Sequence, residues 1–244
     1  MASDLNIDLG EISGVPGAAQ DLELMRYATR ANVACGGHAG HRDRMELICS
    51  AAFEIGTSVG AHPGYNDKGQ FGRRELGLTA AGLTEQAITQ VLLLMEVAES
   101  RNVAVEHVKP HGAMYHRLAR DAEAATMFCS RIGAMVPGIT VIGPPRSALL
   151  DAAQRSGLPT LVEGFADRAY TAPGQLADRK RHGAVLAPAA AAAQAQALGT
   201  GSAFRTVDGA AITLEVQTIC VHGDGDNAVP TAHAVAAALG LRRR

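Results

Sequence analysis

The chain alternates short apolar runs with stretches of helical spacing, and each run ends in Gly or Pro beside polar side chains. A continuously apolar run of this length is typical of a parallel strand that is buried on both faces. The runs are Leu5–Glu11, Val33–His38, Ser58–Gly64, Val105–Gly112, Thr140–Arg146, Leu161–Arg168 and Thr218–Asp226. Their polar residues gather at the carboxyl end, where barrel enzymes assemble their active sites. The pattern therefore predicts seven parallel strands that share one site.

Helical spacing separates most of these runs. Ala87, Val91, Leu94 and Ala98 repeat every three or four residues, which predicts an amphipathic helix with one buried face. Further helices are expected over Ala122–Met135, Ser147–Ser156, Ala187–Gly199 and Thr231–Leu239, and a β-hairpin over Phe204–Val216. Two long loops, His62–Leu78 and Phe165–Gly183, have the length of functional lids or binding loops.

This alternation leaves two α/β architectures, an open doubly wound sheet and a closed barrel. A dinucleotide-binding sheet carries GxGxxG at its first turn, whereas Leu9–Gly14 reads LGEISG and puts Glu11 where a phosphate needs backbone amides. Polar residues at six strand ends also fit a closed ring better than the single switch point of an open sheet. The sequence therefore predicts one domain over residues 1–244, a seven-stranded, TIM-like (β/α) barrel.

The composition argues against several classes of function. The net charge of −2 provides no basic surface for nucleic acid. No apolar run approaches the length of a membrane span, and the acidic segment Met1–Glu11 lacks the apolar core of a signal peptide. We expect a cytoplasmic protein that acts on a small molecule and binds neither nucleic acid nor membranes.

Acidic and imidazole groups follow the first three strands. Strand alternation puts Asn6 and Asp8 on the face opposite Leu5, so that Asp8 points into the barrel mouth with Glu11 just beyond it. Asp8, His38 and His62 would suit a divalent metal that takes one carboxylate and two imidazoles, and His41 is a further candidate ligand. The alternative is that the histidines donate to backbone carbonyls and that the carboxylates cap loops.

The fourth strand ends in His107, Lys109 and His111, which alternation places on one face. Cationic groups this close repel, so the pKa of Lys109 is expected to fall and the side chain to act as an acid or a base. If Lys109 stays protonated, it would instead stabilise an oxyanion or bind a carboxylate. A solvated edge strand is disfavoured because Pro110 and Gly112 end the strand where the polar residues lie.

The sixth and seventh strands add further candidates. Arg168, or Arg73 from the first long loop, has the geometry to bind a substrate carboxylate, although Asp167 and Arg168 could instead form an internal ion pair. His222 and Asp224 end the last strand, and an Asp beside a His commonly orients the imidazole and raises its basicity. The alternative is a turn at Gly223 that Asp224 caps.

Taken together, these clusters resemble the LamB/YcsF family in six collinear motifs. The motifs are DLNIDLGE from Asp4, ANVACGGHAG from Ala31, GAHPGYND from Gly60 with FGRR from Phe71, HVKPHGAMY from His107, FADRAY from Phe165 with GQL and Arg179, and CVHGD from Cys220. The resemblance implies a seven-stranded barrel related to the glycoside hydrolase and sugar deacetylase barrels. It also implies the role of the A subunit of prokaryotic 5-oxoprolinase, which opens 5-oxo-L-proline to L-glutamate with ATP and the partner B and C subunits.

Each candidate residue has an expected role in ring opening, and three residues depart from the family pattern. Gly37, His41 and His116 depart from the family pattern, in which we expect Phe, Asp and Asn. The expected catalytic residues are Asp8, Glu11, Lys109, His111, His222 and Asp224. The expected substrate-binding residues are Asn6, His62, Arg73, Asp167 and Arg168, and the metal ligands, if there is a metal, are Asp8, His38 and His62.

Two other functions stay open at this stage. A stand-alone metal-dependent deacetylase or amidohydrolase would use the metal ligands without ATP, and a non-catalytic subunit would only bind a small carboxylate. Under the leading hypothesis Lys109 and His111 stabilise the oxyanion, and Asp8 or Asp224 with His222 activates water. Lys109→Ala is then expected to abolish glutamate formation with little change in thermal stability. ATP is expected to be handled with or by the partner subunits, because the chain has no phosphate-binding loop of the form GxxxxGK[ST].

Overall fold

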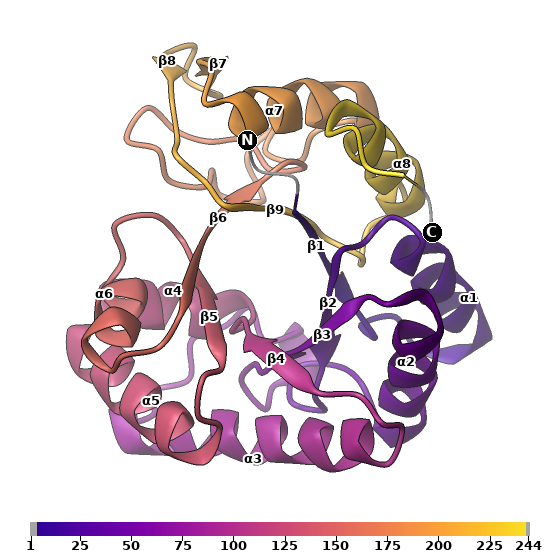
Figure 1. The fold of residues 1–244 in the computed structure, drawn as a ribbon. Helices are drawn as coiled ribbons and strands as arrows, with labels where there is room; N and C mark the ends of the chain where they lie inside the picture. The colour runs from indigo at the N-terminus through magenta and orange to yellow at the C-terminus, as the bar shows by residue number, and fades with distance from the viewer. Residues whose placement is uncertain (1–3, 243–244) are drawn as a thin grey trace.

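All seven apolar runs form strands of one parallel, closed barrel in the computed structural model, which describes residues 4–242. The strands are β1 (Leu5–Leu9), β2 (Arg30–Ala34), β3 (Ser58–His62), β4 (Val105–Val108), β5 (Thr140–Gly143), β6 (Thr160–Phe165) and β9 (Thr218–Val221). The last strand, β9, pairs with both β6 and β1 and so closes the ring (Figure 1). The predicted barrel is confirmed, although the start of Met1–Glu11 and both ends of the expected 1–244 domain lie outside the described residues.

Helices surround this ring and cover its outer face (Figure 1). They are α1 (Gly14–Met25), α2 (Arg42–Ile55), α3 (Ala80–Glu99), α4 (Gly112–Arg120), α5 (Ala122–Met135), α6 (Ala148–Arg155), α7 (Pro188–Thr200) and α8 (Ala228–Ala238), with one short 3-10 helix, η1 (Lys68–Gln70). The helix α4 was not predicted, and only its first residue, Gly112, belongs to the predicted polar strand end. Among the described helices, none is long and apolar enough to cross a membrane.

The predicted hairpin exists but is shorter than expected. Strand β7 (Phe204–Arg205) pairs antiparallel with β8 (Ala211–Ile212), and the two form a small sheet outside the barrel. Figure 1 shows this hairpin beside α7 at the top of the view.

The alternation in β1 divides the apolar core from a polar barrel interior. Leu5, Ile7 and Leu9 belong to the large buried hydrophobic cluster, while Asn6 faces inward. There Asn6 accepts a hydrogen bond from Nδ2 of Asn32 at 2.8 Å, and Oδ1 of Asn32 lies 3.0 Å from Nε2 of His107. Gly60 makes room for this imidazole, since a Cβ there would lie 2.1 Å from the ring. His107 is thus packed within the barrel and does not line the mouth.

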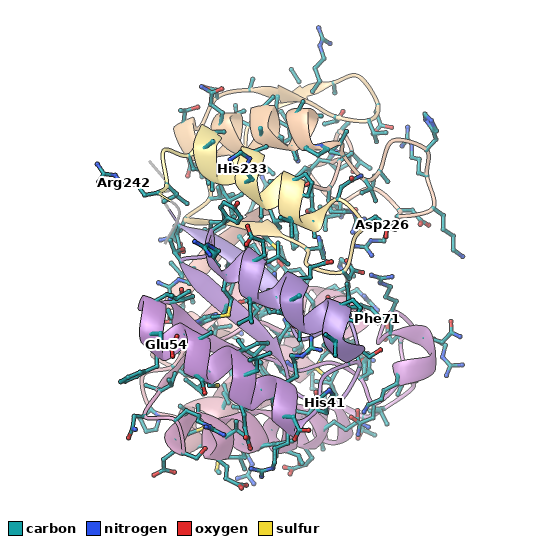
Figure 2. All side chains as sticks on the ribbon, turned by 90° about the vertical axis from the view of Figure 1, so that its right-hand side faces the viewer. His41, Glu54, Phe71, Asp226, His233 and Arg242 are labelled. Atoms are coloured by element: carbon teal, nitrogen blue, oxygen red, sulfur yellow. The ribbon has the colours of Figure 1, made fainter. Side chains whose placement is uncertain are left out.

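Both long loops lie at the carboxyl end of the barrel. Figure 2 shows Phe71, from the loop after β3, and Asp226, from the loop after β9, at one end of the molecule, with Glu54 and Arg242 toward the other end. The loop after β6 is held by two isolated antiparallel bridges, Arg168 with Val185 and Tyr170 with Leu176. The fold therefore presents the predicted polar strand ends and both long loops to one mouth.

Candidate active site

A pocket of about 370 Å³ opens at the barrel mouth. This volume is in the range of about 300–1,000 Å³ that is usual for small-molecule sites. Seven of the predicted site residues line it: Asp8, His62, Arg73, Lys109, His111, Arg168 and His222. Five others, Asn6, Glu11, His38, Asp167 and Asp224, lie behind the wall or beside it, and each of these contacts another site residue.

Lys109 lies at the centre of the site, with its side chain only 2% exposed. Its Nζ lies 2.8 Å from Oδ1 of Asp8, 2.8 Å from Oε1 of Glu163, 2.9 Å from Sγ of Cys220 and 3.1 Å from Oδ1 of Asn6. An ammonium group has three N–H donors, and its hydrogen bonds to Asp8, Cys220 and Asn6 use all three. Oε1 of Glu163 adds an ion-pair contact without a hydrogen bond. Lys109 therefore connects β1, β6 and β9 at the floor of the pocket.

The structure favours a protonated Lys109. Burial disfavours the charged ammonium, but Asp8, Cys220 and Glu163 outweigh burial and hold the pKa of Lys109 well above its ordinary value. The predicted fall in this pKa is wrong, because the neighbours in sequence, His107 and His111, are less important than carboxylates from other strands. Asp8 shows the reciprocal effect: burial raises its pKa, but His62 and Lys109 bring it below its usual range.

Glu163 is a site residue that the sequence analysis missed. Its carboxylate is buried, contacts Lys109 through Oε1 and accepts a hydrogen bond from the hydroxyl of Tyr115 at 3.0 Å. Burial raises the pKa of Glu163, while Lys109 opposes the rise. A signal was present, since Glu163 interrupts an apolar run at the position that alternation places on the same face as Phe165 and Asp167.

His222 is oriented by Asp167 and not by Asp224. Its Nδ1 lies 3.0 and 3.1 Å from the two carboxylate oxygens of Asp167, which also accepts the backbone N–H of His222. Burial lowers the pKa of His222, but Asp167 outweighs burial and raises it. Because Nδ1 donates to Asp167, the second ring nitrogen, Nε2, is left as the basic atom, on a residue that lines the pocket.

Asp224 instead joins the two long loops. It accepts hydrogen bonds from Arg73 of the first loop and, at 3.1 Å, from Arg179 of the second. Burial and Glu11 raise the pKa of Asp224, but Arg179 and His222 bring it below its usual value. Arg179 had no predicted role, although it belongs to the motifs that resemble the family.

Arg168 lines the pocket without a carboxylate partner among residues 4–242. Its Nη2 donates to the carbonyl of Ala177 at 2.7 Å and its Nε to the carbonyl of Ala184 at 3.4 Å. Burial lowers the pKa of Arg168, and the nearby Arg179 lowers it further. The internal Asp167–Arg168 ion pair is therefore not formed, and Arg168 brings a positive charge to the wall of the pocket.

Four buried side chains meet on the other side of the mouth. Ligand atoms of Glu11, His38, His62 and His111 all lie within 4.8 Å of one another, a group that could hold a metal ion. The predicted ligands His38 and His62 belong to this group, together with Glu11 and His111, whereas the predicted ligand Asp8 does not. Asp8 lies next to the group, with Oδ2 3.5 Å from Nε2 of His62, and the candidate ligand His41 is exposed at the start of α2.

Two departures from the family pattern also lie near this site. Gly37 packs against Gln90, whose Nε2 donates to the carbonyl of Gly64 at 2.7 Å, and a Cβ on Gly37 would lie 2.4 Å from Oε1 of Gln90. His116 lines the pocket, where burial and Arg168 lower its pKa. His116 is thus placed to contact a ligand, whereas Gly37 supports the loop after β3.

Comparison with known proteins agrees with these motifs. The model of the LamB/YcsF family matches residues 3–243. The chain belongs to this family. It is 40% identical to a protein of Agrobacterium fabrum named as A subunit 1 of 5-oxoprolinase, over 96% of this chain and 92% of that protein. It is 39% identical to the 5-oxoprolinase A subunit of Chloroflexus aggregans, over 98% of this chain and 94% of that one.

A solved structure shows the same barrel. The lactam utilization protein from Thermus thermophilus superposes on this chain with a TM-score of 0.88 and 32% sequence identity, over the full length of both chains. The barrel that the sequence predicted is therefore the fold of the family.

Proposed function

We propose that this chain is the ring-opening subunit of a 5-oxoprolinase, which hydrolyses 5-oxo-L-proline to L-glutamate with ATP and the partner B and C subunits. The observation that carries the proposal is the pairing, in one pocket, of the Asp167–His222 dyad with the protonated Lys109. Relatives at about 40% identity that are named as the A subunit of 5-oxoprolinase support the choice of substrate.

The dyad suits the activation of water. In the proposed step, the oxygen of a water molecule bonds to the lactam carbonyl carbon while its proton moves to Nε2 of His222. The C–N bond of the ring then breaks, and the proton held on Nε2 of His222 passes to the ring nitrogen, which becomes the amino group of glutamate. Asp167 does not contact the substrate in this step, since its part is to fix the tautomer of His222.

Lys109 suits the stabilisation of the oxyanion that forms on the lactam oxygen. Its three N–H donors are used by Asp8, Asn6 and Cys220, and Cys220 is the weakest of these acceptors because a thiol accepts hydrogen bonds poorly. A substrate oxygen at the pocket floor would take the place of Cys220 while Asp8 and Glu163 keep the ammonium in position. The charge is thus in place before the reaction, as electrostatic catalysis requires.

The arginines at the mouth suit the carboxylate of 5-oxoproline. Arg168 lines the pocket without an acidic partner among the described residues, and Nε of Arg179 is buried there without a hydrogen-bond partner. Arg73 is less suited, because Asp224 already occupies its guanidinium. We therefore assign the carboxylate to Arg168, with Arg179 beside it.

ATP is assigned to the partner subunits. The relatives' designation as A subunits implies that other subunits exist. Within this chain, Asp8 lies near the end of β1 and Glu11 just after it, where a nucleotide-binding loop would offer amides. These carboxylates would repel a triphosphate.

A metal-dependent amidohydrolase is the second candidate function. The group of Glu11, His38, His62 and His111 favours it, because three imidazoles and a carboxylate are ligands that zinc accepts. Such an enzyme would hydrolyse its amide substrate without ATP.

An assay of glutamate formation from 5-oxoproline separates these possibilities. The chain alone, the partner subunits alone and the assembled complex are each measured with and without ATP. We expect turnover only in the complete complex with ATP. ATP-dependent turnover by the chain alone would contradict the assignment of ATP to the partners, and turnover without ATP would favour the amidohydrolase.

His222→Gln in the complex tests whether this subunit is catalytic. We expect a loss of about 100-fold or more in kcat, the scale of general base catalysis. His182→Gln is the matched control, because His182 is exposed in the loop after β6 and does not line the pocket. Full activity of the His222 variant would instead support a subunit that only binds the ligand.

A further inference from the structure

The geometry points to a binding site for one divalent transition-metal ion of the zinc class, formed by Glu11, His38, His62 and His111. The inference goes beyond the proposed ring opening, which is assigned to Lys109 and His222. It rests on which ring nitrogens carry a proton, on the unprotonated nitrogens that face one another, and on access to them from the pocket.

Two of the imidazoles have their tautomer fixed by backbone carbonyls. Nδ1 of His62 lies 2.7 Å from the carbonyl oxygen of Lys109, and Nε2 of His111 lies 3.0 Å from the carbonyl oxygen of Phe71. A carbonyl only accepts, so both of these ring nitrogens carry a proton. In neutral rings the other nitrogens, Nε2 of His62 and Nδ1 of His111, are therefore bare lone pairs.

These bare nitrogens face each other. Nδ1 of His111 lies 3.0 Å from Nε2 of His62 and 3.1 Å from Oε1 of Glu11, and Nε2 of His38 lies 2.9 Å from the same oxygen. Two lone pairs and a carboxylate oxygen repel one another at such distances in a dry interior. A cation among them removes the repulsion, and it would also give a partner to Oε2 of Glu11, which is buried without a hydrogen bond in the described structure.

The spacing of the donor atoms fits an ion of this size. Bonds of about 2.0–2.2 Å place the ligand atoms of a tetrahedral zinc site about 3.3–3.6 Å apart. The four donor atoms lie within 4.8 Å of one another, and the shortest pair, between His38 and Glu11, is 2.9 Å apart. Shifts of a few tenths of an ångström to about 1 Å would therefore bring them onto one ion.

The surroundings hold the rings in place. Metal-bound histidines almost always donate their second ring N–H to a carbonyl or a carboxylate, as His62 and His111 do here. The ring of Phe71 packs edge-on against His38 and His111. The rings of His38 and His111 are stacked nearly parallel at 3.6 Å, so one of them has to tilt for both to bind the same ion. Gly72 permits this close packing, because a Cβ there would lie 2.7 Å from Cβ of His38.

An ion at this position would be open to the substrate side. His62 and His111 line the pocket, whereas Glu11 and His38 lie behind them. Imidazole-rich sets select zinc, cobalt, nickel or copper over magnesium and calcium, which prefer oxygen ligands. We therefore expect this group of four residues to bind a metal ion that prefers imidazole ligands and that a molecule in the pocket can reach.

Metal titration of the full chain, without substrate or partners, tests the site. After dialysis against a chelator, zinc is added in a calorimeter, and cobalt is added while the visible spectrum is recorded. We expect one zinc per chain, a cobalt spectrum typical of nitrogen ligands, and no measurable binding of magnesium. A folded wild-type chain that binds neither zinc nor cobalt would overturn the inference. The donor atoms would then be held together by a proton shared among them.

Variants locate the ion. His111→Gln and Glu11→Gln are expected to weaken zinc binding by at least about 100-fold, since even indirect supports of metal ligands account for about 10- to 100-fold. His41→Gln is the matched control, being exposed three residues from His38. Circular dichroism shows which variants are folded, and two substitutions protect the test against a folding failure in one. Equal zinc affinity in the folded variants and the control would place the ion elsewhere and overturn the proposal. These readouts do not involve glutamate formation, so they are independent of the proposed function.

Discussion

The two sides of the barrel mouth differ in how deeply their side chains are buried and in the sign of the ligand charge that they suit. On the side of β1 to β4, the side chains of Glu11, His38 and His111 are at most 5% exposed, and both histidines contact Oε1 of Glu11. On the side of β6 and β9, Asp167, His222, Asp224 and Arg179 are 11–29% exposed, and arginines add positive charge. In the two proposals above, the first side would hold a cation in a fixed place, and the second would face an incoming anion.

Lys109 is the link between the two sides. It reaches Asp8 beside the imidazole group and Glu163 on β6, so that one buried ammonium balances carboxylates from both halves of the barrel. Removing Lys109 is therefore expected to disturb both sides of the mouth, whereas a change on one side alone is expected to affect that side only.

The largest effect is therefore expected for Lys109→Ala. Removing one partner of a buried ion pair leaves an unpaired charge and costs about 3–5 kcal/mol. The variant should lose that much unfolding free energy in chemical denaturation and also lose glutamate formation. This differs from the expectation of near-intact stability drawn from the sequence, because Asp8 and Glu163 are now seen to depend on the same Nζ.

Lys180→Ala is the control for this substitution. Lys180 is exposed at the mouth, and surface substitutions usually change stability by no more than about 0.5 kcal/mol. A Lys109 variant that unfolds at the same denaturant concentration as the control would show that the ammonium does not connect the two sides.

The barrel could be predicted because strands buried on both faces must be apolar, and the seven runs showed this directly. Even the fifth run was informative: it ends in Arg146 without an Asp, Glu, His or Lys, and no residue of β5 lines the pocket. The polar ends could be assigned to one mouth, since parallel strands bring their carboxyl ends together.

The partners within the site could not be predicted, because they depend on how the loops cross the mouth. Asp224 is two residues from His222, but the oriented pair forms with Asp167, which is 55 residues away in the sequence. His107 and His111 suggested a lowered pKa for Lys109, whereas Asp8 is 101 residues away and dominates. The local spacing thus indicated which residues belong to the site, but it did not indicate which of them contact one another.

Asp167→Asn tests whether Asp167 orients His222 on the side of β6 and β9. The amide no longer fixes the tautomer of His222, so kcat in the complex should fall by about 10²–10⁴-fold. As a general base, His222 works when it is neutral, and Asp167 raises its pKa. In the wild type, kcat/KM should therefore fall as pH drops through this raised pKa, and in the variant the fall should move to lower pH.

The stability of the pair has the opposite pH dependence. Because the folded pKa of His222 is raised, the protonated pair adds stability that is fully present below the ordinary pKa of about 6.5. This contribution is lost as pH rises through the folded pKa, so Asp167→Asn should lower the Tm more at pH 5.5 than at pH 8.5. An unchanged pH profile of kcat/KM would show that His222 is not the base.

The smallest expected effect is on substrate binding, and it should differ between Arg168 and Arg73. Arg168→Gln should raise KM for 5-oxoproline by about 10- to 100-fold with a smaller change in kcat, the scale of a hydrogen bond to a charged group. Arg73→Gln should raise this KM less, because Arg73 is 43% exposed and is paired with Asp224. On 2-pyrrolidinone, which lacks the carboxylate, Arg168→Gln and the wild type should differ little, and this distinguishes a lost substrate contact from a disordered loop. Equal sensitivity of both substrates to Arg168→Gln would contradict carboxylate binding and would assign Arg168 to holding Ala177 and Ala184 in the second loop.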